Sequence, residues 1–83
     1  MISADQCRSA RILLGWTAAD LVEASGLGIA TIKRFESGQT VQGATVATIA
    51  ATITAAGIEL IAPGAKSSGG GAGVRLIAPS STG

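Results

Sequence analysis

The 83-residue chain has no histidine and no tyrosine, and it contains one cysteine, one phenylalanine and one tryptophan. Histidine is the most common general base, so its absence excludes the usual activation of a serine or threonine nucleophile. A single thiol excludes an internal disulfide, and the five carboxylates are too scattered along the chain to predict a metal site. We therefore expect no enzyme activity, no catalytic residue, no metal and no cofactor.

Long apolar runs are also missing from the sequence. No stretch approaches the ~20 residues of a membrane-spanning helix. The first residues, Met-Ile-Ser-Ala-Asp-Gln, lack the basic start and the apolar segment of a signal peptide. These observations predict a cytoplasmic protein that does not engage a membrane.

The charge of the chain is nearly balanced, with six basic and five acidic residues and a formal net charge of +1. Residues 1–61 hold four of the basic and all five of the acidic residues, so this part carries 4 − 5 = −1. Phosphate neutralisation supplies most of the non-specific affinity for DNA. A domain with this balance is therefore expected to bind DNA weakly, to bind it as a dimer, or not to bind it.

The most informative feature is a series of short helical patterns separated by glycines. Ser3 is a good N-cap with Gln6 in the capping-box position, and Gly15 follows the last apolar residue. These signals predict a first helix over 4–14. Cys7 lies on the apolar face of this helix, where we expect a small core residue.

The segment from Thr17 to Phe35 contains two further helical patterns joined at one glycine, the arrangement that a helix-turn-helix needs. Thr17 and Asp20 start a helix that ends near Ser25, with Gly26 as its C-terminal cap. The third helix starts at Gly28 and ends near Ser37. The residues expected to face inward are Leu21, Val22, Leu27, Ile32 and Phe35. The residues expected to face outward are Gly28, Ile29, Ala30, Thr31, Lys33 and Arg34.

Beyond a loop at 39–44, the sequence predicts a fourth helix over 45–56. Its apolar residues Val46, Ile49, Ala50 and Ile53 share a helical face, whereas Val46 and Ile49 would lie on opposite sides of a strand. Two short strands are expected at 58–61 and 74–77, separated by a flexible Gly- and Ser-rich tether at 62–73. The glycines of this tether lack the flanking strand, helix and Lys-Ser/Thr of a phosphate-binding loop.

The two strands are predicted to pair either within one chain or with those of a second chain, so they form a candidate dimerisation element. The sequence thus divides into a helical domain at 1–56, a strand pair with its tether at 57–78, and a disordered tail at 79–83.

Three stretches of the sequence carry a resemblance to a known family. These are CRSARILLGWT at 7–17, ATIKRFESGQT at 30–40, and the pair GIELI and GVRLI near the C-terminus. Over about residues 3–56 the chain resembles the small Xre/Cro-type helix-turn-helix regulators related to phage repressors. The resemblance implies an all-α, compact domain of four to five helices with a short C-terminal strand pair. It also implies a transcription regulator that binds operator DNA as a homodimer.

The resemblance assigns roles by position. The third helix would enter the major groove, with base contacts from Ile29, Ala30, Lys33 and Arg34. Gly28 and Thr31 match positions that commonly contact phosphate. Apart from the resemblance, we expect Arg8 and the backbone amide of Ala18, at the start of the second helix, to contact phosphate as well. Arg11 and Glu36 match an ion pair that ties the first helix to the end of the third, and we interpret this pair as structural.

The chain departs from the family pattern at several positions. Ala18 stands where the family usually has a phosphate-binding glutamine, and Val22 stands where it has a small alanine. Gly28 lacks the expected polar side chain, and Gln42-Gly43 replaces a common proline and basic residue. These changes support an alternative hypothesis, in which the chain is a protein-interaction or antitoxin-like module that keeps the fold but binds DNA weakly or not at all.

Overall fold

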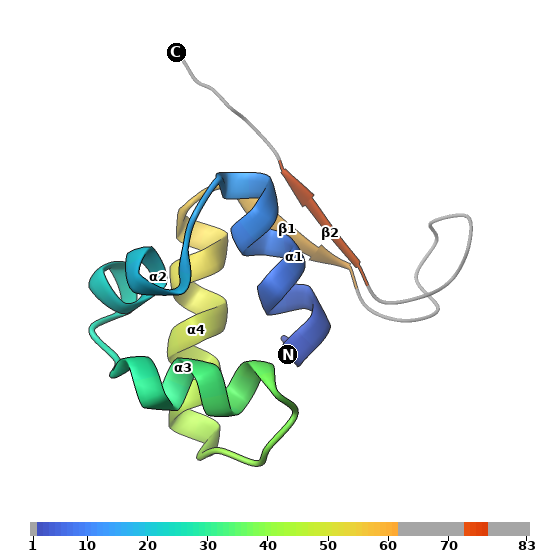
Figure 1. The fold of residues 1–83 in the computed structure, drawn as a ribbon. Coiled ribbons are helices and arrows are strands. Elements are labelled where there is room, and N and C mark those ends of the chain that lie inside the picture. The colour runs from blue at the N-terminus through green and yellow to red at the C-terminus, as the bar shows by residue number, and fades with distance from the viewer. Residues whose placement is uncertain (1, 62–72, 77–83) are drawn as a thin grey trace.

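The computed structural model describes residues 2–61 and 73–76, which form a small, mostly helical domain with a two-stranded antiparallel sheet (Figure 1). The helices within these residues are α1 (Ala4–Leu14), α2 (Ala18–Ser25), α3 (Ile29–Glu36) and α4 (Gly43–Ala55). The strands are β1 (Ile58–Ile61) and β2 (Gly73–Leu76). The expected tether, apart from Gly73, and the expected disordered tail lie outside the described residues.

The first two helices begin and end where their capping residues predict. Ser3 and Gln6 form a complete capping box at the start of α1, and Thr17 and Asp20 form another at the start of α2. The glycines that follow these helices adopt the left-handed conformation, with φ of 71° at Gly15 and 77° at Gly26. Local sequence signals therefore determine both helices, since each cap acts within three or four residues.

The ends of α3 and α4 differ slightly from the sequence predictions. Helix α3 ends at Glu36, with Ser37 as its C-cap. Helix α4 begins at Gly43, two residues before the predicted start, and it ends at Ala55. Glycine is a poor helix former, so the sequence pattern assigned Gly43 to the loop. In the structure, Gln42 is the extended N-cap, and its carbonyl oxygen accepts the amide of Val46 at 3.1 Å.

The core lies where α4 crosses the other helices (Figure 1). Ile49 and Ile53 on α4 are fully buried, and the predicted apolar face of this helix is completed by Val46 and Ala50. Leu21, Ile32 and Phe35 are buried as expected, while Val22 and Leu27 pack against them at half-buried positions. The core also includes Ile2, Cys7, Ala10 and Ile58.

The two strands pair within one chain, in a register that aligns Ile58 with Leu76 and Ile61 with Gly73. The second strand covers 73–76, one residue earlier than predicted, and Ile77 lies outside the described residues. The sheet lies against α1 and follows the C-terminal end of α4 (Figure 1). Consequently the sheet and α3 lie at opposite ends of the domain.

Candidate nucleic-acid interface

Helix α3 presents most of its predicted contact residues to solvent. Ile32 is fully buried and Phe35 is 8% exposed, and together with Glu36 they hold one side of α3 against the domain. The side chains on the opposite side and its flanks are exposed at Ile29, Ala30, Lys33 and Arg34, and half-buried at Thr31. Ala30 and Arg34 are four residues apart, so they lie on one outward row of the helix.

The connection between α2 and α3 is short, and it requires a glycine at position 26. Gly26 takes a positive φ that other residues adopt only with strain, and its amide donates to Val22 O at 2.9 Å. Gly28 is the N-cap of α3, is exposed, and makes no side-chain cap. Leu21 on α2 and Ile32 on α3 are both fully buried in the shared core. The turn and this packing together fix the angle at which α3 leaves α2.

The C-terminal end of α3 is held by an ion pair between Arg11 and Glu36. Arg11 Nε donates to Glu36 Oε2 and Arg11 Nη2 donates to Glu36 Oε1, both at 2.8 Å. The same guanidinium donates through Nη1 to the carbonyl oxygen of Trp16 at 3.2 Å. The two side chains are only 18% and 10% exposed. Such a bidentate, largely desolvated pair fixes the distance between α1 and α3.

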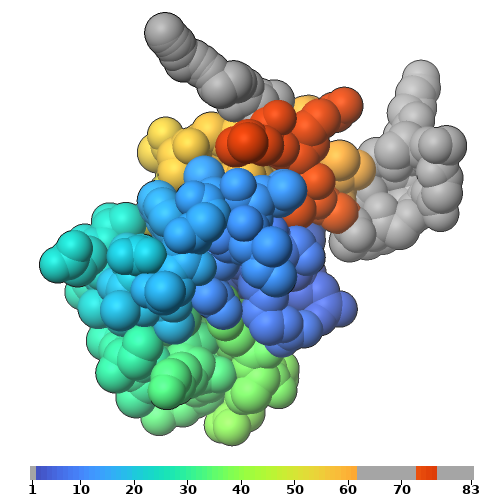
Figure 2. Space-filling model, turned by 45° about the horizontal axis from the view of Figure 1, so that its top comes forward, coloured from blue at the N-terminus to red at the C-terminus, as the bar shows by residue number. Residues whose placement is uncertain are grey.

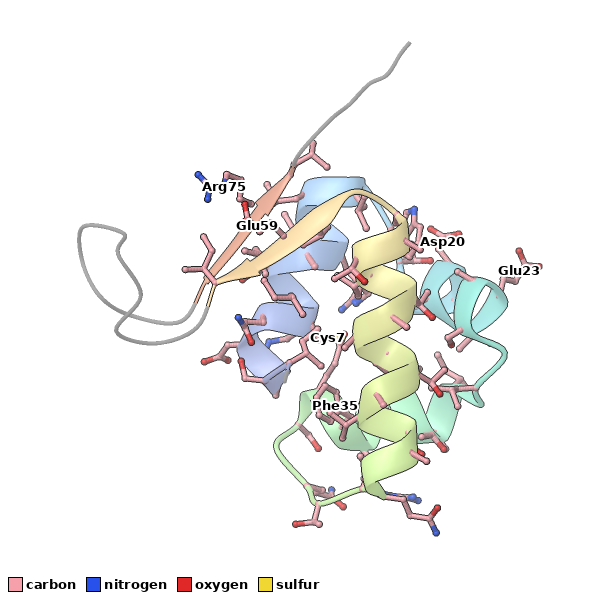
Figure 3. The ribbon with its side chains drawn as sticks, turned by 180° about the vertical axis from the view of Figure 1, so that it is seen from behind. Cys7, Asp20, Glu23, Phe35, Glu59 and Arg75 are labelled. Atoms are coloured by element: carbon pink, nitrogen blue, oxygen red, sulfur yellow. The ribbon has the colours of Figure 1, made fainter. Side chains whose placement is uncertain are left out.

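Cys7 joins the same carboxylate from the core side. Its Sγ donates to Glu36 Oε2 at 3.1 Å, and the cysteine itself is fully buried. Figure 3 shows Cys7 on α1 and Phe35 on α3 pointing into the interior between these helices and α4. Burial, together with the hydrogen bond to Glu36, raises the pKa of the Cys7 thiol to about 12. The thiol is therefore protonated and acts as a hydrogen-bond donor.

Glu36 is ionised in this environment. Burial by itself would raise the pKa of the Glu36 carboxyl, but hydrogen bonds from Arg11 and Cys7 and the charge of Arg11 oppose it, and the pKa is lowered. The hydrogen bond to Glu36 likewise raises the pKa of Arg11. The pair is thus fully charged near neutral pH.

Arg8, which we expected to contact phosphate, is engaged within the protein. Its Nη1 donates to the carbonyl oxygen of Glu36, and its Nη2 pairs with the carboxylate of Asp5. The side chain remains 44% exposed. Arg8 therefore satisfies a carbonyl at the C-terminal end of α3 and supplies a cation there, where the helix dipole favours one.

Ion pairing decides which charged side chains of the described residues remain without a partner of opposite charge. Three arginines are paired with acids: Arg8 with Asp5, Arg11 with Glu36, and Arg75 with Glu59. Among the described residues, the two cations outside any ion pair are Lys33 and Arg34, which are adjacent on α3. The acids outside ion pairs in the same residues are Asp20 and Glu23, both on α2 (Figure 3). The surface of α3 is therefore basic although residues 1–61 carry a net charge of −1.

A groove of about 570 Å³ lies beside α3 where it faces the start of α4. Thr31 and Arg34 line it from α3, and the remaining lining residues are Thr40, Val41, Gln42 and Thr45. The N-terminus of α4 at this groove has no side-chain cap and no acidic residue in its first turn. The groove is thus lined by Arg34 and three threonines and lies at the positive end of a helix dipole, which is a combination suited to an anion.

The sequence predictions identified only part of this arrangement. Thr31 and Arg34 were predicted contact residues and Thr45 was predicted to begin the fourth helix, whereas Thr40, Val41 and Gln42 were assigned to the loop and given no contact. The signal that was available was the run of Thr40, Gln42 and Thr45 around a helix start. Ala18 is half-buried against the core and has no polar side chain, so it can offer only its backbone amide to a phosphate.

No protein-family model matches the sequence, and no curated protein matches it. The resemblance to Xre/Cro-type regulators therefore stays an expectation from the motifs. In the described part of the chain, no three histidine, cysteine or acidic side chains gather to hold a metal ion. No helix in that part has both the length and the apolar character needed to span a bilayer.

Proposed function

We propose that α2 and α3 form a helix-turn-helix and that the protein is a sequence-specific DNA-binding transcription regulator, with α3 in the major groove. The observation that carries this proposal is the surface of α3, where Lys33 and Arg34 stay outside the ion pairs that hold the other described arginines. A helix of eight residues is about 12 Å long, which is similar to the width of the major groove, and the groove admits an α-helix. The exposed row of Ala30 and Arg34 would face the base edges.

Arg34 would make the strongest specific contact. A guanidinium forms two parallel hydrogen bonds with N7 and O6 of guanine, the most common specific contact in the major groove. The side chain is exposed at the border between the outer face of α3 and the groove beside α4. It can therefore reach a base or the phosphate next to it, and these two roles have different consequences for specificity.

The groove beside α4 would hold one phosphate of the DNA backbone. Thr31, Thr40 and Thr45 are among the residues that line it, and it lies at the start of α4, which has no side-chain cap. Phosphate contacts fix the register of a protein on DNA without reading its sequence. This groove supports the proposal because it lies on the flank of α3, where the backbone of a bound duplex would run.

The protein would act as a homodimer. About 12 Å of α3 covers only three or four base pairs, which is too short a sequence for a selective site. Two copies would read two half-sites about 34 Å apart on one face of the duplex. Dimerisation would also double the number of cations available for phosphate neutralisation, and so offset the low net charge.

The proposal is tested by fluorescence anisotropy with DNA from upstream of the protein's own gene, beside a scrambled duplex, at several salt concentrations. We expect preference for the native duplex and an affinity that falls steeply with salt. Absence of binding to both duplexes at ~50 mM salt, where electrostatic attraction is strongly felt, would contradict the proposal.

Arg34→Ala separates the two roles of that residue. A lost guanine contact costs ~1–3 kcal/mol and relaxes specificity at one position. A lost phosphate contact instead weakens binding to all duplexes alike and reduces the salt slope by about 1. Lys66→Ala is the matched control, since it removes the same charge from a part of the sequence outside the predicted helical domain.

One observation favours a protein-interaction module as a second candidate function. Ile12 is 77% exposed, and Leu13 and Leu76 are each 45% exposed. Gln6 on α1 bonds to Gly73 on β2, and both elements run in the same direction from there (Figure 1). Seven helical residues and three strand residues each advance about 10 Å, so Leu13 and Leu76 lie at the same level.

Ile12 and Leu13 belong to α1 and Leu76 to β2, and these two elements lie side by side at the end of the domain remote from α3 (Figure 2). A partner protein bound there would leave α3 free, so this function does not compete with DNA binding for the same surface. Leu13→Ser should abolish such an interaction and leave the DNA affinity unchanged. If instead DNA binding is absent and Leu13→Ser abolishes binding to a protein partner, the second candidate is the function.

A further inference from the structure

We infer that Ile29, in the first turn of α3, recognises the 5-methyl group of a pyrimidine in the major groove, so that 5-methylcytosine can replace thymine in the binding site. This inference rests on the proposed function and names the feature of DNA that the helix reads. It starts from the side chains that α3 exposes in its first turn. Gly28, Ile29 and Ala30 are three consecutive exposed residues, and none has a polar side-chain atom.

Ile29 is not needed to fill the core of the domain. Its side chain is 43% exposed, whereas Ile32 on the same helix is fully buried. Of the large apolar side chains that are exposed in the described residues, Ile29 is the one on α3, and the other three belong to α1 and β2. Covering this exposed isoleucine with a ligand would therefore gain the free energy of removing its apolar surface from water.

The charges beside Ile29 determine which ligand fits. Lys33 is four residues after Ile29, and Arg34 is four residues after Ala30, so each apolar residue has a cation one turn away on its own row. Neither cation is in an ion pair of the described structure. A purely apolar protein surface would leave both cations desolvated without a partner, at a high cost. DNA supplies phosphates and guanine acceptors for the cations.

DNA also supplies one apolar group for Ile29 and Ala30. In the major groove the base edges present hydrogen-bond donors and acceptors, and the C5-methyl group of thymine is the apolar exception. Because Gly28, Ile29 and Ala30 lack side-chain donors and acceptors, they cannot distinguish bases through side-chain hydrogen bonds. They can distinguish a pyrimidine with a 5-methyl group from one without it. Cytosine methylated at C5 carries this group at the same ring position as thymine.

The experiment starts by selecting binding duplexes with the full-length protein from a pool of 20-base-pair duplexes with a randomised centre. Each thymine of the enriched duplex is then replaced by deoxyuridine, which removes the methyl group and keeps the Watson–Crick pair. We expect at least one position where this replacement weakens binding by about 4-fold, the effect of one buried methyl group. At that position, a C·G pair should bind weakly and 5-methylcytosine·G should recover affinity.

Ile29→Ala identifies the side chain that makes the contact. This variant should bind the thymine and deoxyuridine duplexes with nearly equal affinity, because the contact is already missing. Lys33→Ala is the matched control, since it should weaken binding to both duplexes and preserve the difference between them. The circular dichroism of each variant checks its folding, and the deoxyuridine replacement needs no variant at all.

The outcomes separate the inference from the proposed function. If duplexes are enriched but deoxyuridine binds as tightly as thymine at every position, the protein reads DNA and the methyl inference is wrong. If the difference is present and Ile29→Ala retains it, the inference is also wrong, since another residue makes the contact. If no duplex is enriched at low salt, the proposed function fails and the inference fails with it.

Discussion

The side chain of Gln6 bonds to the backbone of Gly73, 67 positions later in the chain, with Nε2 donating to the carbonyl oxygen at 2.8 Å. The same nitrogen donates to Ile61 O at 3.0 Å, and Gln6 Oε1 accepts the amide of Ser3 at 2.9 Å. Gln6 is only 4% exposed. One amide group therefore completes the cap of α1 and holds together the ends of the two strands, where the tether leaves β1 and enters β2.

Gln6→Leu should destabilise the protein, because it removes half of the capping box and leaves two backbone carbonyls without their donor. We expect a loss of about 2–4 kcal/mol in the free energy of unfolding. Urea denaturation monitored by Trp16 fluorescence measures it. Gln42→Leu is the control, since Gln42 is exposed and makes no side-chain cap. Equal stability of the two variants would show that Gln6 does not hold the strands.

Arg11→Ala should be strongly destabilising, because it leaves the carboxylate of Glu36 buried without its main partner. Breaking a desolvated pair of this kind costs about 3–5 kcal/mol. Arg75→Ala breaks a pair whose side chains are 61% and 47% exposed, and its cost should stay below about 1 kcal/mol. Thermal denaturation of both variants gives the comparison. A similar effect of the two substitutions would contradict the structural role of the buried pair.

Stability should decrease in acid because of Glu36. Its pKa is lowered in the folded protein from the ordinary value of 4.5. The unfolded chain therefore takes up a proton first, and the stabilisation present above pH 4.5 is lost as the pH falls toward the folded pKa. Urea titrations between roughly pH 6 and pH 3 measure this loss. Glu36→Gln should be less stable at pH 6 and should show a shallower decline, and an unchanged decline would assign the acid sensitivity to other carboxyls.

Cys7 should be unreactive in the folded protein. The thiol is fully buried, so a reagent cannot reach it, and its pKa is raised to about 12, so it is not a thiolate near pH 8. A disulfide reagent such as DTNB should label it only in urea, or at the rate at which the domain opens. Rapid and complete labelling without denaturant would show that α1 does not pack as described.

The helices were predictable from the sequence because their signals are local. The capping boxes at Ser3 and Thr17 and the left-handed glycines at Gly15 and Gly26 act within one turn, and the apolar period of α4 identified Ile49 and Ile53 as core residues. The start of α4 was predicted two residues late, because Gly43 has no helical signal of its own and its position depends on the path of the preceding loop.

The sequence by itself thus determined the helices, their order and the outward residues of α3, since these follow from capping and periodicity. Only the tertiary structure decided how the strands pair. The strands, and the Gln6 side chain that bonds to both of them, lie far apart in the sequence. The tertiary structure also decided where the charges act. Counting residues gave a nearly neutral domain, whereas folding pairs Arg8, Arg11 and Arg75 with acids and leaves Lys33 and Arg34 together on α3. Ion pairs depend on distances in space, and composition contains no distances.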